Sequence, residues 1–338
     1  MEKQLKLLVL CSLAFLAACN RGTNFDVDVS KITVDVKVER FDVDFTNIDP
    51  AKVYSSVPEL QKKYGDFFNF YVDNIISIGT PETAKFQSNY ADFINWARLN
   101  TIISSVENVF PKEVNLEPLF VEGFKHYKYY FPNDSLPKIA TIIAGYHESV
   151  FPTDNLLAFS LEKYLGTQYY NLYESFGIQR YNWVRMGKES LPVDYFRALI
   201  NLRYPKTEDI EDNLLNEMIY RGRNQFFLKS MMPSLPDSLL WGYTDVQYRW
   251  VEYYESNIWT YLVDRKLLFD RTPLAIRNLT GEGPYTNAFG NQSAPGAASY
   301  CGYRIVCNYM KNHPDVTLQQ LMTTKDFNEI YSKARYNP

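Results

Sequence analysis

The sequence predicts an α+β fold that is predominantly helical, and three observations support this class. Two N-terminal stretches, 25–30 and 32–41, alternate apolar and polar residues with the period of two expected of strands that have one wet face. Two apolar runs, 138–145 and 156–161, have the composition of buried strands. Beyond Leu191, apolar residues recur mostly at helical spacing. We therefore expect N-terminal strands and a small sheet joined to a helical body.

Helices are also expected between the N-terminal strands and the apolar runs. Apolar residues follow helical spacing over 58–75, and Pro58 suits the first turn because the N–H it lacks has no helical partner there. A second stripe covers 86–97. A third covers 120–131 and is stopped by Pro132.

Two capping boxes mark helix starts in the last third of the chain. The sequence TDVQ at 244–247 is followed by apolar residues at helical spacing over 251–262, and TLQQ at 317–320 has the same form. Another helix is expected to begin near Ala297.

The first eighteen residues have the three-part layout of a secretory signal. Lys3 and Lys6 are followed by an uncharged run over 7–18, which is too short for a spanning helix because such a helix needs roughly 17–25 apolar residues. The run ends in LAAC, which resembles the lipobox of bacterial lipoproteins and makes Cys19 the expected lipid anchor. An ordinary secretory signal with a chance cysteine is the alternative.

This layout divides the chain into a signal peptide (1–18), a lipidated tether (19–24) and a single α+β domain (25–338). The N-terminal lipid makes the membrane the first expected partner. No acidic cluster follows Cys19, which favours a periplasm-facing domain in the cell envelope. Nothing in the sequence distinguishes the inner from the outer membrane.

Charge and cysteine content exclude two further classes. The formal net charge is −4, and no basic stripe is present, whereas nucleic-acid binding needs clustered Lys and Arg. Apart from the signal and the anchor, only Cys301 and Cys307 remain. Six residues apart on an expected helix, they face different sides, so we expect two buried thiols and no disulfide.

No known catalytic pattern is visible. The three histidines are His126, His147 and His313, and Phe151 stands four residues after His147, so HExxH is absent. We expect surface or capping histidines. A G-x-S-x-G elbow and a phosphate-binding loop are also missing, and the acidic run at 208–212 suits a solvated helix start. The sequence therefore predicts no catalytic residues, no metal and no cofactor.

The most unusual local sequence is the loop 281–296, which combines glycines, amides and two aromatic residues. Loops of this composition often bind partners, because glycine permits close backbone approach and amides offer paired donors and acceptors. A structural loop that uses glycine for its turns is the alternative. The candidate interaction residues are Glu282, Tyr285, Asn287, Phe289, Asn291 and Gln292.

Short stretches distributed along the chain resemble the GldB-type gliding motility lipoproteins. They occur in order and cover nearly all of the chain after the signal: VERFD (38–42), KKYGDFF (62–68), KYLG (163–166), MIYRGR (218–223), GYT (242–244), ESNIW (255–259), GPYT (283–286), GYRIV (302–306) and KARY (333–336). The resemblance implies a lipid-anchored envelope protein associated with gliding.

The same family is distantly similar to a group of predicted zinc proteases. In those proteins one helix carries HExxH, and a glutamate just before a glycine on a later helix completes the site. Here Arg221 precedes Gly222, and the expected earlier helix over 193–202 contains no histidine. The resemblance thus implies a degenerate zincin-like scaffold that has lost its metal.

Three functional hypotheses follow. The first is a non-catalytic envelope lipoprotein that serves as a structural or interaction subunit in machinery for gliding motility or secretion, with other envelope proteins as partners. The second is a glycan- or peptide-binding lipoprotein, although Trp241, Trp250 and Trp259, nine residues apart, could not share one face of a single helix. The third is a degenerate relative of zinc proteases.

Overall fold

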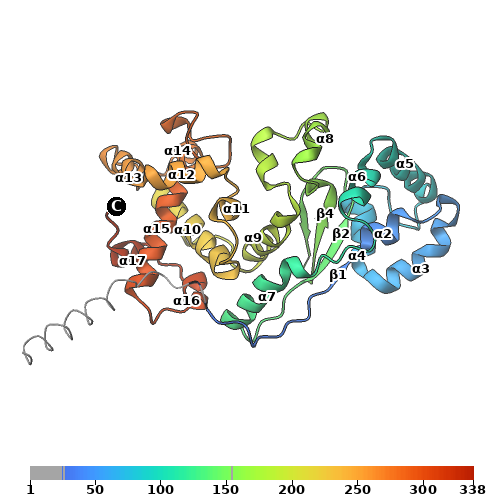
Figure 1. Ribbon diagram of the computed structural model, residues 1–338, viewed down its shortest axis with the longest axis horizontal. Helices are drawn as coiled ribbons and strands as arrows, with labels where there is room; N and C mark the ends of the chain where they lie inside the picture. Colours follow the sequence, from blue (N-terminus) through green and yellow to red (C-terminus); the bar gives the residue numbers. More distant parts are fainter. Residues whose placement is uncertain (1–24, 26, 154) are drawn as a thin grey trace, which may run out of the picture. The chain divides into compact units, whose positions relative to one another are not determined.

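The computed structural model describes residues 25, 27–153 and 155–338 and confirms a predominantly helical α+β fold (Figure 1). The expected signal peptide, the lipid anchor Cys19 and the tether lie outside the described residues. Contacts divide the described chain into two compact units. We call 31–205 with 234–248 the sheet unit, and the described part of 1–30 with 206–233 and 249–338 the helical unit.

The sheet unit is built on a four-stranded mixed sheet in the order β1-β2-β4-β3. The strands are β1 (Val38–Glu39), β2 (Lys138–Ile142), β3 (Val150–Pro152) and β4 (Leu156–Ser160). β1 and β4 run parallel to β2, and β3 pairs antiparallel with β4. The two apolar runs thus form the central strands, as predicted, because a strand covered on both faces needs no polar alternation.

The prediction of two N-terminal strands is largely wrong. The described residues of 25–30 form no strand, and of 32–41 only the two residues of β1 pair with β2. Val38 lies opposite Ile139, so an extended ladder would place Val36 opposite Pro137. Proline has no N–H to donate. Its carbonyl oxygen already accepts a hydrogen bond of 2.8 Å from the Tyr195 hydroxyl, so the ladder stops.

Helices of the sheet unit cover both faces of the sheet (Figure 1). They are α2 (Phe41–Thr46), α3 (Val53–Tyr64), α4 (Asp66–Phe70), α5 (Phe86–Leu99), α6 (Ile102–Val109), α7 (Pro118–Tyr130), α8 (Tyr170–Ser175), α9 (Leu191–Arg203) and α11 (Asp237–Trp241). α5 and α7 confirm the predicted stripes. The helix expected from Pro58 begins earlier, at Val53, so Pro58 is internal, and this first helix ends before Gly65.

Aromatic side chains form the core of the sheet unit. On the side of α7 and α9, the Phe159 ring of β4 lies 6.2 Å from Phe120 and 6.4 Å from Tyr195, measured between ring centroids. Near α2 and α4, Phe41 and Tyr71 meet edge to face at 4.7 Å, and the Tyr71 hydroxyl donates to the Ile143 carbonyl oxygen at 2.6 Å. Edge-to-face rings with satisfied hydroxyls suit a tyrosine-rich interior.

The helical unit is organised around two long helices, α10 (Leu214–Met231) and α15 (Ala297–Asn312). Its other helices are the end of α12 (Asp245–Tyr253), α13 (Glu255–Asp264), α14 (Pro273–Thr280), α16 (Leu318–Thr323) and α17 (Phe327–Ala334). At the crossing of α10 and α15, Gly222 meets the backbone of Gly302, and Gly302 meets the carbonyl of Met218. A Cβ at either glycine would overlap these backbone atoms, so both glycines are required for the close approach.

Both predicted capping boxes form. The Thr317 hydroxyl accepts from the Gln320 N–H while the Gln320 side chain accepts from the Thr317 N–H, which opens α16. Thr244 and Gln247 make the same reciprocal pair at 3.0 and 3.2 Å before α12. The apolar residues that follow lie on two helices, α12 and α13, which break at Tyr254. Among the described residues, none of the helices is long and apolar enough to cross a membrane.

Cys301 and Cys307 on α15 are buried and form no disulfide, as predicted. Burial raises the pKa of the Cys301 thiol to about 12. Since the thiolate is the reactive form, we expect iodoacetamide at pH 8 to alkylate Cys301 at least about 100-fold more slowly in the native full-length protein than in urea. Peptide mapping by mass spectrometry measures this rate. Equal rates in both conditions would show that the α15 core opens readily.

A candidate interaction site on the helical unit

The loop 281–296 connects α14 to α15 and is fixed from within by two buried hydroxyls. The Thr286 N–H donates to Ser293 Oγ at 2.9 Å, and Thr286 Oγ1 donates to the Ala294 carbonyl oxygen at 2.8 Å. The Ala297 N–H donates to Thr286 Oγ1 at 3.0 Å. Thr286 and Ser293 are almost fully buried. These bonds hold the two sides of the loop together at the start of α15.

The predicted candidate residues lie on the outer side of this loop. Glu282, Tyr285, Asn287, Asn291 and Gln292 are exposed, whereas Phe289 is half-buried. Sequence reasoning found these side chains but missed the two anchoring hydroxyls, which stand among them. The loop therefore has an inner side that holds its structure and an exposed outer side, and binding by the outer side chains stays a prediction.

Phe289 connects the loop to aromatic residues of α12 and α13, of which Trp250 and Tyr261 are half-buried and Tyr253 and Tyr254 are exposed. Its ring lies 5.0 Å from Tyr261 and 6.1 Å from Trp250. Trp250 lies 5.0 Å from Tyr254, which meets Tyr253 edge to face at 4.9 Å. We call these five residues the aromatic surface. Tyr253 is 79% exposed, the highest value among the exposed tyrosines of the described chain.

The sequence did not reveal the aromatic surface. It predicted a single helix over 251–262, whereas the structure has two helices that break at Tyr254, and Phe289 comes from the distant loop. Of the three tryptophans weighed as a stacking platform, Trp241 on α11 and Trp259 on α13 are buried. Only Trp250 joins the surface, with Tyr253 and Tyr254 rather than with the other tryptophans.

The chemistry of the aromatic surface suits recognition of another molecule. The Arg265 guanidinium lies 4.7 Å from the centre of the Tyr261 ring, a cation–π contact. The exposed amides of Asn287, Asn291 and Gln292, on the same loop as Phe289, add neutral donors and acceptors. Tyrosine and arginine are enriched in protein interfaces, where aromatic rings bury a large area at low entropic cost.

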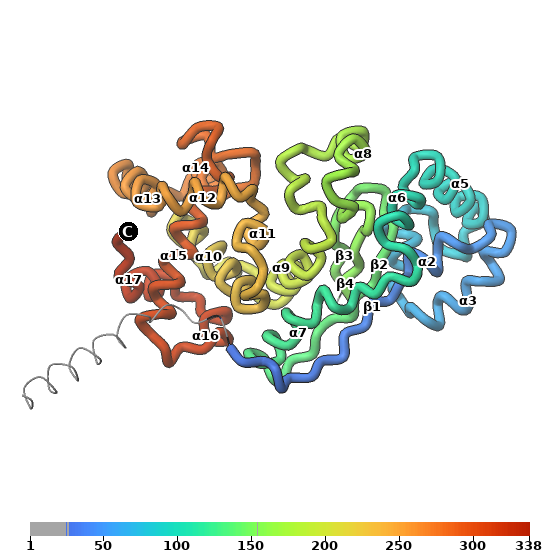
Figure 2. The backbone as a smooth tube through the Cα atoms, viewed as in Figure 1, coloured from blue at the N-terminus to red at the C-terminus, as the bar shows by residue number. Residues whose placement is uncertain are grey.

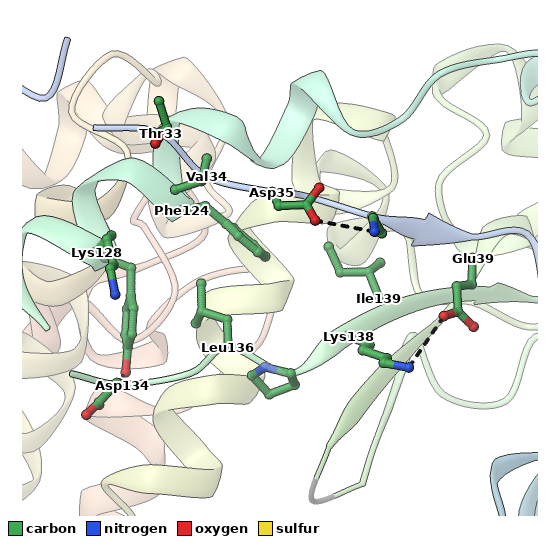
Figure 3. Close-up of a pocket in the computed structure, with 13 residues that line it drawn as sticks. Thr33, Val34, Asp35, Glu39, Phe124, Lys128, Asp134, Leu136, Lys138 and Ile139 are labelled. Atoms are coloured by element: carbon green, nitrogen blue, oxygen red, sulfur yellow. Dashed lines mark hydrogen bonds and ion pairs between the residues drawn. The ribbon is translucent and has the colours of Figure 1, made fainter. Parts of the chain in front are cut away.

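A separate groove of about 550 Å³ lies on the sheet unit (Figure 3). The chain before β1 forms one side, the segment leading into β2 forms the other, and α7 contributes Phe124 between them. Its lining residues are Thr33, Val34, Asp35, Lys37, Glu39, Phe124, Tyr127, Lys128, Asp134, Leu136, Pro137, Lys138 and Ile139. Sequence reasoning did not predict this groove, because its walls are far apart in the chain.

Glu162 is a fully buried carboxyl group just after β4. Its Oε1 accepts hydrogen bonds from the N–H groups of Ala144 at 2.7 Å and Tyr146 at 3.1 Å, in the turn after β2. Tyr146 has a left-handed φ of 66°, which is strained for an aromatic residue. Burial raises the pKa of Glu162, although the backbone hydrogen bonds oppose this shift. In the sequence, Glu162 is a single glutamate after an apolar run, and nothing there indicates that it accepts hydrogen bonds from a distant turn.

The histidines do not come together as a site. His126 is buried on α7, with Nδ1 2.9 Å from the Glu122 carbonyl oxygen, so the expectation of a surface or capping position is wrong for it. His147 is exposed. His313 is the C-cap of α15, in agreement with the prediction. No group of three potential metal ligands occurs among the residues that the structure describes.

Arg221, which stands where the protease resemblance would place a ligand, is held by its own helix. Its Nε donates to a Glu217 carboxylate oxygen at 2.7 Å, one turn earlier on α10. Lys206 approaches the other oxygen of Glu217 at 3.2 Å. The carboxylate nearest to Arg221 therefore serves two cations.

Comparison with known proteins identifies the family. The family model for the gliding motility protein GldB matches residues 22–338, which is nearly the whole chain. No curated protein and no solved structure matches. The family stretches MIYRGR and GYRIV contain Gly222 and Gly302, so they meet at the crossing of α10 and α15. This chain therefore belongs to the GldB family of gliding motility lipoproteins.

Proposed function

We propose that this protein is a non-catalytic interaction subunit of envelope machinery linked to gliding motility or secretion. A lipid on Cys19 would hold it at the membrane, facing the periplasm. The loop 281–296 and the aromatic surface would contact another envelope protein. Family membership supports the link to gliding and to a lipid-anchored place in the cell envelope.

The observation that carries the proposal is a fixed loop beside exposed rings. Binding costs free energy whenever a flexible loop must become ordered, and the Thr286 and Ser293 hydrogen bonds reduce that cost beforehand. Tyr253 and its neighbours supply aromatic anchors of the kind that dominate binding energy at interfaces. A subunit that recognises a folded partner needs both features.

The same surface supports a second candidate, a glycan. The exposed face of Tyr253 could stack on a sugar ring while the amides of Asn291 and Gln292 bind hydroxyl groups. The protein partner is favoured, because Trp250 and Tyr254 lie tilted to each other at 37° and form no flat platform for one sugar.

We expect Tyr253→Ser to reduce recovery of the partner about tenfold when the full-length lipidated protein is purified from cross-linked native envelopes. An aromatic hot spot contributes roughly 2 kcal/mol or more to binding, which is enough for this loss. Mass spectrometry measures the recovered proteins. Tyr129→Ser is the matched control, because Tyr129 is 48% exposed and lies on α7 of the sheet unit.

Four results would count against the proposal. The first is the absence of a reproducible partner, and the second is equal recovery with the Tyr253 and Tyr129 variants. Binding to a glycan array that Tyr253→Ser abolishes would favour the second candidate. Stoichiometric zinc, together with peptide hydrolysis that a chelator abolishes, would overturn the non-catalytic role.

A further inference from the structure

The groove on the sheet unit lies beside backbone groups that no strand has taken. Residues 33–36 are extended and lead into β1 (Figure 2). Among the described residues, none of their N–H and C=O groups forms a hydrogen bond. Pro137 prevents β2 from pairing with them, because it lies where the partner of Val36 would be and has no N–H. This short segment is therefore an open edge of the sheet.

The space beside this edge has the chemistry of a strand-binding groove. Val34, Phe124, Leu136 and Ile139 give it an apolar lining, and Figure 3 shows Phe124 between the two chain segments that form its sides. Added strands gain affinity from main-chain hydrogen bonds and specificity from pockets for alternate side chains. The unpaired groups of 33–36 and the apolar lining offer both.

Charge indicates which peptide would fit. Lys37 pairs with Asp35 at 3.3 Å, and Lys138 approaches Glu39 at 3.8 Å. Lys128, the third lysine of the lining, is exposed and donates to the Pro132 carbonyl oxygen at 2.5 Å. No carboxylate of the described chain pairs with Lys128. An acidic side chain of a bound peptide would supply that charge.

We propose that this groove binds an extended peptide segment of another protein, which adds as a strand to residues 33–36 and places an acidic side chain against Lys128. This interaction is independent of the aromatic surface, and it goes beyond the proposed function. It assigns a second kind of contact to the chain, made by main-chain pairing rather than by aromatic anchors.

A displayed library of random nonapeptides, selected with the full-length protein in detergent micelles, tests the proposal. We expect enriched peptides to alternate β-branched residues with polar ones and to contain an acidic residue. On binding, those amides of 33–36 that face the groove should become protected from hydrogen exchange, and the alternate amides should not. Methylation of the backbone nitrogens in a selected peptide should reduce its affinity at least about tenfold, because it removes the donors of the ladder.

Variants of the protein distinguish main-chain pairing with residues 33–36 from non-specific binding of the peptide to the groove. Successive N–H groups of an extended chain point to opposite edges, so at least one of Val34→Pro and Asp35→Pro removes a donor that faces the groove. At least one proline variant should bind about tenfold more weakly than the alanine variant at the same position, because alanine removes the side chain but keeps the N–H. Lys128→Glu should weaken binding, and Lys125→Glu, one turn away on α7, should not.

Each result of these experiments either supports the peptide-binding groove or overturns it. Lack of enriched peptides, equal binding by the proline and alanine variants, or full affinity of the methylated peptide would each overturn the proposal. If Tyr253→Ser abolished peptide binding and the groove variants left it unchanged, the peptide would lie on the aromatic surface instead. That result would overturn this inference and leave the proposed function standing.

Discussion

Gly302→Ala is expected to lower the free energy of unfolding of the helical unit by about 3 kcal/mol or more. Together with Glu162→Ala, it has the largest effect on stability that we predict. The added Cβ would overlap the Met218 carbonyl of α10. Backbone atoms cannot move aside as a side chain can, so α10 and α15 must separate and lose packing along their length. Hydrogen exchange of α10 and α15 amides, read by mass spectrometry, should become roughly 100-fold faster.

Gly283→Ala is the matched control for this variant. Gly283 lies in the loop after α14, and a Cβ there would come no closer than 3.7 Å to the Tyr285 carbonyl oxygen, which is ordinary contact. We expect its exchange rates to match those of the wild type. If Gly302→Ala behaved like Gly283→Ala, the close crossing of the two helices would be disproved.

Glu162→Ala is expected to lower the free energy of unfolding of the sheet unit by about 3 kcal/mol. It leaves the buried N–H groups of Ala144 and Tyr146 without their acceptor and opens a cavity beside them. Glu162→Gln keeps an acceptor oxygen for both groups and should cost much less. Urea unfolding followed by circular dichroism measures the difference, and equal losses in the two variants would contradict this role of the carboxyl group.

The same residue should make stability depend on pH. Burial raises the pKa of Glu162 in the folded state above 4.5, so the folded protein binds this proton more tightly than the unfolded chain does. Its contribution is therefore fully present below pH 4.5 and is lost as the pH rises through the raised pKa. The unfolding free energy of the wild type should fall relative to Glu162→Gln over this window. A constant difference from pH 4.5 to pH 9 would contradict the prediction.

Sequence patterns predicted the elements whose burial is complete or strictly periodic. The run at 138–145 could be recognised as a central strand because both of its faces are covered. The alternation over 25–41 revealed which side chains face water but not whether a neighbouring strand would be available, and Pro137 decided that point. For α3, the buried stripe from Val53 to Tyr64 compensates for Pro58, so the position of the proline misplaced the helix start.

The sequence predicted some parts of the candidate site and not others. Loop composition identified the exposed residues around Asn291, because glycines and amides leave a local signal. The aromatic surface depends on the break at Tyr254, and the buried carboxyl of Glu162 depends on a turn that is sixteen to eighteen residues away. His126 was misjudged because Lys125 and Lys128, which lie close to it in the sequence, suggest an exposed position, whereas α7 turns the His126 side chain inward. Contacts distant in sequence leave no local pattern.

In the loop 281–296, the residues that hold the backbone differ from the residues that face solvent, and this separation affects how the protein can change during evolution. The inward hydroxyls of Thr286 and Ser293 hold the backbone, and the outward side chains contribute none of those bonds. Substitutions at Asn287 or Gln292 should therefore cost little in folding. Under the proposed function, relatives that keep the two hydroxyls would exchange one partner for another by drift at the outer positions, much as antibody loops vary on a constant scaffold.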